Sequence, residues 1–500
     1  MRLNEAKHMN YYSTRSLTET TAAGAIAQGL APDGGLFVPM EIPQLTAADL
    51  EALCKMDYRR RAVNVMARYL PEFSAGELEA FARAAYGENF DVSAIAPVHA
   101  LDDRTSFLEL WHGPTCAFKD MALQMLPHLL TASLKKTGEQ RQVCILVATS
   151  GDTGKAALQG FADVPGTKIM VFYPDGGVSD VQRLQMVTQQ GNNVGVCAVQ
   201  GNFDDAQTGV KQIFGNADIA AQLSAKGWFL SSANSINWGR LLPQIVYYIS
   251  AYCDEINAGC IRMGEKLNFV VPTGNFGNIL AGWYAKQMGL PVNRFVCASN
   301  ENNVLTDFIR TGTYNKNRPV HVTASPSMDI LVSSNLERLL FTLSGSAPET
   351  DGYMKALREA GQYTVSRELL GKLQSEFSCG FCDDTRTRAA IGSVWKQHHY
   401  LMDTHTAVAY QVLCDYRKET GDETPAVVVS TASPFKFCDH VLTAIGGNAD
   451  APGVQLIDRL SEASGIPAPK PLAGLAEREV RFGGSVEKTA MPKVVLDFLK

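Results

Sequence analysis

The sequence predicts an open α/β fold in which mainly parallel strands alternate with helices. Continuous apolar runs such as Val143–Ala148 and Leu267–Val271 have the composition of parallel strands that are buried on both faces. Each run leads into a loop rich in glycine and hydroxyl side chains, and a helical pattern of apolar residues follows. Because this alternation repeats between Phe107 and Ser430, we expect ligands to bind at the carboxyl ends of the strands.

The chain of 500 residues is long enough for two or three domains. Residues 1–98 combine turns with helical patterns near Ala47–Leu53 and Ala75–Ala85, which predicts an α-rich N-terminal domain. Residues 311–383 are also mostly helical in pattern, and we interpret them as a helical insertion. Between these parts the strands and helices follow one another. The predicted strands are 143–148, 168–173, 194–199, 267–271, 294–298 and 426–430, and the helices are 155–162, 181–190, 204–214, 240–253 and 279–288.

Composition excludes several classes of function. The net charge is −6 with both signs interspersed, so nothing indicates binding to nucleic acid or to a membrane surface. No run approaches the ~18 apolar residues of a transmembrane helix. The first twenty residues are polar and charged, so no signal peptide is expected. Together these features predict a cytoplasmic protein.

The eleven cysteines are scattered through apolar runs, as expected of small core residues in a reducing compartment. Cys379 and Cys382 have the spacing of metal ligands. There is no second pair of this kind, and the nearby histidines lack a zinc-finger spacing, so we predict no metal site.

Lys119, in the stretch His112–Asp120, is the candidate nucleophile. A Gly-Pro turn precedes it and a helical apolar pattern follows, so it should lie in the first turn of a helix. The positive end of a helix and burial beside Phe118 both favour a neutral amine, the form that attacks a carbonyl to make a Schiff base. Taken by itself, this pattern also fits a solvated lysine at the start of a helix.

Two strand–helix loops are candidate anion sites. The loop Thr273–Asn278 holds two glycines and precedes a helix, a geometry that binds phosphate through backbone N–H groups. It is neither a nucleotide-hydrolysing P-loop nor a dinucleotide fingerprint. The loop Thr149–Gly154 is rich in hydroxyl groups and N–H donors, which suits a carboxylate, although Asp152 would repel one. Each loop could also be a plain turn.

Thr431 follows the last buried strand, where its hydroxyl could bond to a ring nitrogen or cap a turn. A lysine, a phosphate loop, a carboxylate loop and this hydroxyl are the four contacts that pyridoxal phosphate and an amino acid require. The motifs also resemble those of one family, threonine synthase. The matching stretches are the surroundings of Lys119, 148–154, 234–238, 272–278, 325–330 and 430–432, together with Tyr12–Arg15 and Pro32–Pro39, which resemble the longer bacterial and fungal branch.

The resemblance implies the tryptophan-synthase-like fold (fold type II), with two open sheets and pyridoxal 5'-phosphate as cofactor. It implies a smaller subdomain at 99–235 and a larger one at 236–500. It also implies a lyase that converts O-phospho-L-homoserine and water to L-threonine and phosphate. By the same resemblance Lys119 forms the Schiff base, Thr431 faces the pyridine nitrogen, and Ser150, Gly151 and Thr153 hold the substrate carboxylate. The cofactor phosphate is assigned to Gly274, Asn275, Phe276, Gly277 and Asn278.

Several points stay open at this stage. The substrate phosphate needs a cation, and Lys155, Arg183 and Arg240 are the candidates. The role of His405 is open, as is the choice between monomer and homodimer.

Three departures from the family pattern are Asp152 in place of Asn, Asn278 in place of Asp, and the segment with Ser433 and Phe435 after Thr431. Asp152 is therefore an uncertain ligand of the cofactor ring oxygen. Alternative functions are a threonine or serine dehydratase of the same fold, a non-catalytic homologue that binds the cofactor, and a nucleotide-binding α/β protein.

Overall fold

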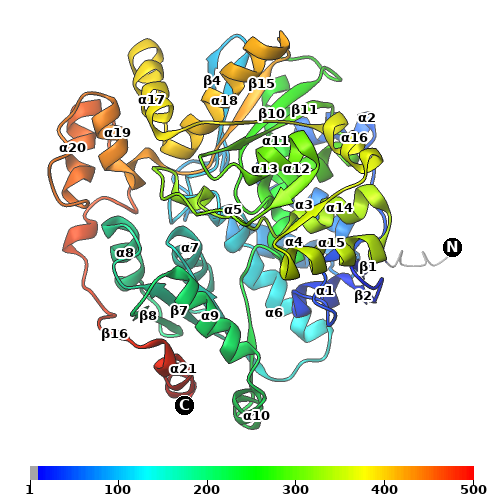
Figure 1. Cartoon of the computed structure of the whole chain (residues 1–500), viewed down its shortest axis with the longest axis vertical. Helices are drawn as coiled ribbons and strands as arrows, with labels where there is room; N and C mark the ends of the chain where they lie inside the picture. The colour runs from blue at the N-terminus through cyan, green and yellow to red at the C-terminus, as the bar shows by residue number, and fades with distance from the viewer. Residues whose placement is uncertain (1–8) are drawn as a thin grey trace.

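The computed structural model describes residues 9–500 and contains two sheets of mainly parallel strands (Figure 1). This arrangement confirms the predicted α/β class. Residues 1–8 lie outside the described residues. They begin the polar stretch in which we expect no signal peptide. In the part of the chain that the structure describes, no helix is both long and apolar enough to cross a membrane.

The larger sheet has six strands. They are β4 (Val98–Asp102), β5 (Thr105–Glu109), β10 (Leu267–Pro272), β11 (Val292–Ser299), β14 (Phe377–Phe381) and β15 (Ala426–Ser430). Their order is β14-β11-β10-β15-β5-β4, and only the hairpin β4–β5 is antiparallel. The central strands β10 and β15 are buried along their whole length, as their continuous apolar sequences predict.

Helices cover both faces of the larger sheet (Figure 1). The longest, α11 (Trp238–Asn257), is buried on almost every side and packs against α12 (Gly277–Gln287), which follows β10. The others are α13 (Val304–Thr311), α17 (Asp384–His398), α18 (Thr404–Thr420), α19 (Cys438–Ala444) and α20 (Gln455–Ser464).

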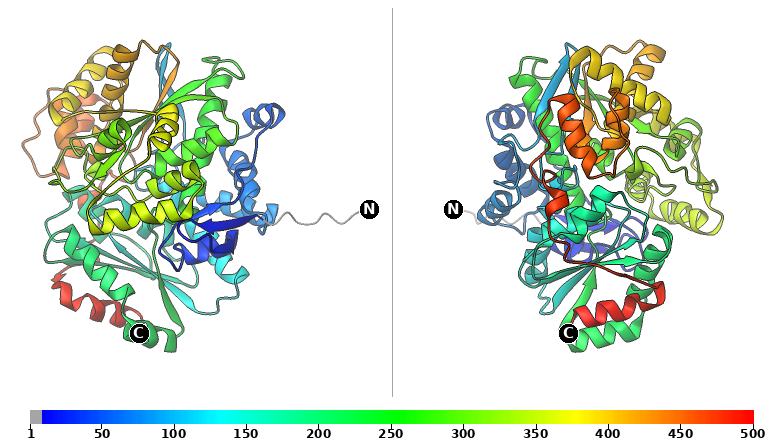
Figure 2. Two further views of the ribbon diagram at one scale, coloured as in Figure 1. Left: turned by 45° about the vertical axis from the view of Figure 1, so that its right-hand side comes forward. Right: turned by 90° about the vertical axis from the view of Figure 1, so that its left-hand side faces the viewer.

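The smaller sheet has five parallel strands in the order β16-β8-β7-β6-β9. They are β6 (Gln142–Ala148), β7 (Thr167–Pro174), β8 (Val194–Val199), β9 (Trp228–Ser231) and β16 (Ser485–Val486). The helices of this half are α7 (Asp152–Phe161), α8 (Asp180–Val187), α9 (Phe203–Phe214), α10 (Ala217–Ala225) and α21 (Met491–Phe498). Figure 2 shows the C-terminal helix against this half of the molecule.

The N-terminal domain is rich in helices, as predicted, and adds a small antiparallel sheet in the order β2-β1-β3. Capping boxes at Thr46 and Ser74 start two of its helices. Its core continues into the part of the molecule built on the larger sheet. The ring centroid of Trp238 on α11 lies 5.4 Å from that of Tyr11 and 5.6 Å from that of Tyr69. The elements are β1 (Asn10–Ser13), β2 (Glu19–Thr21), α1 (Ala22–Gln28), β3 (Phe37–Pro39), α2 (Ala47–Cys54), α3 (Tyr58–Tyr69) and α4 (Ala75–Ala85).

The segment predicted as a helical insertion contains three helices and a short antiparallel ribbon. Its end, Phe377–Phe381, is not part of the insertion but an edge strand of the larger sheet, because it pairs with β11. The elements are β12 (Thr313–Asn315), η1 (Pro326–Met328), α14 (Leu336–Ser344), α15 (Ala347–Glu359), β13 (Gln362–Thr364) and α16 (Arg367–Glu376).

The sheets divide the chain differently from the expected boundaries at 99–235 and 236–500. Strands β4 and β5 belong to the larger sheet, because β5 pairs with β15. The C-terminal strand β16 belongs to the smaller sheet, because it pairs with β8. The predicted helix after Lys119 is also divided, into α5 (Asp120–Leu123) and α6 (Leu126–Lys136).

Candidate active site

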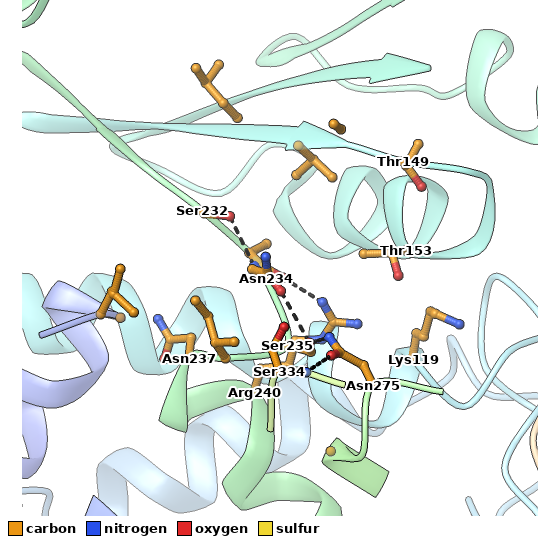
Figure 3. Close-up of a pocket in the computed structure, with 18 of the residues that line it drawn as sticks. Lys119, Thr149, Thr153, Ser232, Asn234, Ser235, Asn237, Arg240, Asn275 and Ser334 are labelled. Carbon is orange, nitrogen blue, oxygen red and sulfur yellow. Dashed lines mark hydrogen bonds between the residues drawn. The ribbon is translucent and has the colours of Figure 1, made fainter. Parts of the chain in front are cut away.

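One cavity of about 1180 Å³ lies where the carboxyl ends of strands from both sheets meet. Its wall includes the ends of β6 and β10 and the residue after β15, as predicted for an open α/β fold. Figure 3 shows Lys119, Arg240 and Asn275 on the side of the cavity that faces Thr149 and Thr153. The structure therefore brings the predicted lysine and both predicted loops to one site.

Lys119 is the residue that precedes α5, and only 9% of it is exposed. Hydrogen bonds fix its segment to the end of β15: the Phe118 N–H donates to the Thr431 carbonyl at 2.8 Å, and the Ser433 N–H donates to the Cys116 carbonyl at 3.1 Å. Burial lowers the pKa of Lys119 to about 8; Asp152 opposes this change, and Arg240 adds to it. Lys119 therefore loses its proton more readily than an exposed lysine, as expected of a nucleophile.

His112 pins the turn that carries Lys119. Its Nδ1 lies 2.7 Å from Asp91 Oδ1, and its Nε2 lies 2.8 Å from Glu109 Oε2. Burial opposes the charged imidazole, but the two carboxylates outweigh burial and raise the pKa of His112 to about 9. Through these two contacts, the charged His112 side chain links the turn that carries Lys119 to the N-terminal domain and to β5.

We expect the His112 contacts to stabilise the protein at neutral pH and to be lost in alkali. The folded pKa lies above the ordinary value of about 6.5, so the stabilisation is complete below that pH and disappears as pH rises through about 9. Because Asp91 is partly exposed, we expect a loss of about 1–2 kcal/mol. Urea unfolding of wild type and His112→Gln between pH 6 and pH 10 tests this. Their difference in stability should shrink as pH rises, and a difference independent of pH would contradict the assignment.

The phosphate loop joins β10 to α12. Phe276, the residue before the helix, has left-handed backbone geometry (φ 63°) and provides no side-chain cap, so the first N–H groups of α12 remain available to an anion. Gly274 passes close to the turn at η1: a Cβ there would lie 2.7 Å from the Ser327 carbonyl oxygen. Asn275 fixes the loop, since its Oδ1 accepts from the Ser334 N–H at 2.7 Å and its amide donates to Ser235.

Asn278 occupies the first turn of α12 behind this loop. Its Oδ1 accepts hydrogen bonds from the Tyr247 hydroxyl at 2.6 Å and the Tyr248 hydroxyl at 2.7 Å. Its buried Nδ2 has no partner among residues 9–500. The amide therefore turns a donor away from the tyrosines, which fits an anionic group at the loop better than a carboxylate in this position would.

The carboxylate loop is shaped by Thr149. Its Oγ1 accepts from the N–H groups of Gly151 at 3.0 Å and Gly154 at 2.9 Å. Ser150 and Thr153 line the cavity, whereas Gly151 faces Gln182, where a Cβ would lie 2.4 Å from that side chain. The predicted hydroxyl groups thus reach the cavity and the glycine permits the turn.

Asp152 lines the cavity but is paired with a residue that sequence reasoning missed. Lys436 Nζ lies 2.6 Å from Asp152 Oδ1, and both side chains are buried. Burial would raise the pKa of Asp152, but the charges of Lys436 and Lys119 hold it well below its usual range. The sequence does contain a signal for Lys436: it stands between Phe435 and Phe437, and a lysine in such an apolar setting needs a charged partner.

The three candidate cations occupy different places. Arg240 lines the cavity, and its Nη1 donates to the Ala233 carbonyl at 2.7 Å. Lys155 is buried on α7 with its Nζ bonded to Gln189, outside the cavity wall, and burial lowers its pKa to about 7. Arg183, on α8, does not line the cavity either. Of these three candidates, Arg240 alone lines the cavity and is placed to meet a ligand.

His405 also lines the cavity and holds a neighbouring segment of its wall in place. Its Nε2 accepts from the Ser327 N–H at 3.2 Å, and its Nδ1 lies 2.9 Å from Asp403 Oδ1. An acceptor at Nε2 and a carboxylate at Nδ1 define the neutral tautomer with its proton on Nδ1. His405 therefore holds η1 beside the phosphate loop. Thr431 completes the wall on this side.

The cysteine pair lies elsewhere. Cys379 is on the edge strand β14, and Cys382 is buried beside Thr387. No group of three or more His, Cys, Asp or Glu side chains with metal-binding geometry occurs among residues 9–500.

Comparison with known proteins assigns the class. Residues 99–432 match the family model described as pyridoxal-phosphate-dependent enzyme. With two sheets of mainly parallel strands, a buried lysine and a phosphate loop at one cavity, the chain is a pyridoxal-phosphate-dependent enzyme of fold type II. Residues 10–86 match the threonine synthase N terminus, and residues 406–492 match its C-terminal model. The chain belongs to the threonine synthase family.

Individual relatives agree with this. Threonine synthase of Schizosaccharomyces pombe is 37% identical over 476 residues, which are 89% of this chain and 91% of that protein. Threonine synthase-like 1 of Homo sapiens is 42% identical over 437 residues; the chain spans only 57% of its length. The pyridoxal-phosphate-bound threonine synthase structure from Brucella melitensis superposes with a TM-score of 0.87 at 37% identity, over 98% of both chains. The yeast enzyme gives 0.88 at 31% identity, also over 98% of both.

Proposed function

We propose that this protein is a threonine synthase: a lyase that converts O-phospho-L-homoserine and water to L-threonine and phosphate by β,γ-elimination and replacement. This is the last step of threonine biosynthesis. The observation that carries the proposal is that the Lys119 amine, the N-terminus of α12 and Arg240 share one cavity. A dehydratase acts on substrates without a phosphate, so it has no need of a second anion contact.

The residues of the cavity fit pyridoxal phosphate. The loop Gly274–Asn278 offers N–H donors at a helix start, and the free Nδ2 of Asn278 adds another donor on the same helix. Lys119 supplies the amine for a Schiff base, and Thr431 supplies a hydroxyl for the pyridine nitrogen, which then needs no full charge. When bound, the cofactor supplies an electron sink for a carbanion at the substrate α-carbon. For Asp152 we propose a place beside the ring oxygen.

The remaining roles follow from charge and geometry. Ser150 and Thr153, with the turn at Gly151, hold the substrate carboxylate. Arg240 binds the substrate phosphate, since it is the candidate cation on the cavity wall. The Nζ of Lys119 in its neutral form takes the α-proton and retains it beside the reacting carbons. His405 keeps the wall at η1 in place.

We further propose a cytoplasmic location. All eleven cysteines are free thiols, and six of them are buried, as suits a reducing compartment. The partner of the protein on this proposal is its small-molecule substrate.

One assay tests the function. Purified protein with pyridoxal phosphate is given O-phosphohomoserine, and phosphate and threonine are measured together. Equal amounts of both support the proposal. An oxoacid in place of threonine would indicate a dehydratase, and cofactor binding without turnover would indicate a non-catalytic homologue.

A further inference from the structure

Lys436 connects the two loops that carry the chemistry of the cavity. It lies in η2 (Pro434–Lys436), a short distance along the chain from the end of β15, and its side chain is fully buried. Its Nζ lies 2.6 Å from Asp152 Oδ1 and donates to the Thr115 carbonyl at 3.1 Å. Thr115 belongs to the turn that carries Lys119, and Asp152 belongs to the carboxylate loop. A single ammonium group therefore fixes both loops to the strand end.

The partners of Asp152 leave one of its oxygens free. Gln182 Nε2 donates to Asp152 Oδ1 at 3.0 Å, the same oxygen that Lys436 contacts. The other oxygen, Oδ2, accepts no hydrogen bond within residues 9–500, and Asp152 lines the cavity. An ionised carboxylate thus stands on the wall of the cavity into which Lys119 projects.

Several charged or titratable groups surround Lys119. Asp152 on α7 and Asp120 on α5 favour the ammonium form, whereas Arg240 on α11 and Lys436 on η2 oppose it. His405 on α18 lines the same cavity in its neutral form. Among these groups Asp152 has the largest effect in favour of the ammonium, which is not a nucleophile. Offsetting the charge of Asp152 therefore favours the reactive amine.

We propose that Lys436 is a positioning residue for Lys119: it offsets the charge of Asp152 and so keeps the Lys119 amine available in its neutral form. The role goes beyond structural support because it predicts opposite effects for the two members of the pair. Without Lys436, the Asp152 carboxylate acts on Lys119 uncompensated and favours the ammonium form. Without Asp152, the Lys436 ammonium acts uncompensated and favours the neutral amine. The inference rests on the proposed role of Lys119 as the nucleophile.

The test measures how the attachment of pyridoxal phosphate to the cofactor-stripped full-length protein depends on pH. Absorbance follows the reaction, and mass spectrometry after borohydride reduction locates the modified lysine. We expect Lys436→Met to raise the pH midpoint of attachment by about one pH unit and Asp152→Asn to lower it by about the same amount. The double variant should return close to wild type, because both charges are then absent. Lys436→Arg keeps the charge and should leave the midpoint unchanged.

The outcomes separate the inference from the proposed function. Lys119→Ala should remove the modification; if it persists at another lysine, the assigned role of Lys119 is wrong. If it disappears but Lys436→Met and Asp152→Asn move the midpoint in the same direction, or Asp152→Asn does not move it, the inference about Lys436 is wrong. Should Lys436→Met fail to fold because it strands a buried acid, the double variant, which strands none, still decides the matter. Its midpoint should lie about one pH unit above that of Asp152→Asn, and equal midpoints would overturn the inference about Lys436.

Discussion

Replacing Lys119 with alanine is expected to reduce threonine formation by about 10³-fold or more, because the variant loses both the Schiff-base amine and the group that moves the α-proton. The phosphate loop is untouched, so the variant should still bind pyridoxal phosphate, but without a covalent bond. The measurements are threonine and phosphate production, and the release of cofactor on dialysis. Retention of the covalent cofactor would contradict the assignment.

A matched control for this variant is Lys211→Ala. Lys211 also lines the cavity, on α9, but it is an exposed residue and its Nζ donates to Gln207 Oε1 at 3.2 Å. We expect this variant to keep the cofactor and nearly all activity. In wild type, attachment of the cofactor should accelerate as pH rises through about 8, the lowered pKa of Lys119. That dependence should be absent from Lys119→Ala.

Local patterns predict the elements and loops of the site because each depends on neighbouring residues. The run Val143–Ala148 corresponds to β6 with one residue added, and the pattern at Ala75–Ala85 has the bounds of α4. Lys119 and the loop Thr273–Asn278 could be found because a strand, a turn and a helix follow each other in sequence. The fold type itself came from the resemblance of several such stretches to one family.

Contacts between distant residues could not be found in this way. The Asp152–Lys436 pair, like the β16–β8 pairing, joins parts of the chain that are far apart in sequence, and no local periodicity reports it. The position of Arg240 on the cavity wall, and of Lys155 away from it, depends on which side of each helix faces the cavity. Helical periodicity marks an apolar face, but α11 is buried on almost every side, so that face does not tell which of its residues border the cavity.

The second large effect is expected at Arg338, a fully buried arginine on α14. Its Nε donates to the Phe37 carbonyl at 2.9 Å, and its Nη2 donates to the Ile236 carbonyl at 2.5 Å. Its Nη1 donates to Asn335 Oδ1 at 2.5 Å, and the Asn335 N–H in turn donates to the Asn275 carbonyl of the phosphate loop at 3.2 Å. Arg338 thus joins the N-terminal domain, the segment before α11 and the phosphate loop.

Arg338→Met leaves those three acceptors, which are buried or half-buried, without their donor. At about 1–3 kcal/mol for each, we expect the free energy of unfolding to fall by about 3 kcal/mol or more. Because Asn335 loses its support, the affinity for pyridoxal phosphate should also fall. Urea unfolding and cofactor titration measure the two effects, and Arg358→Met, at a largely exposed position on α15, is the control that should change neither. A stable variant with weak cofactor binding would show that Arg338 acts on the loop alone, and an unaffected cofactor affinity would refute the connection through Asn335.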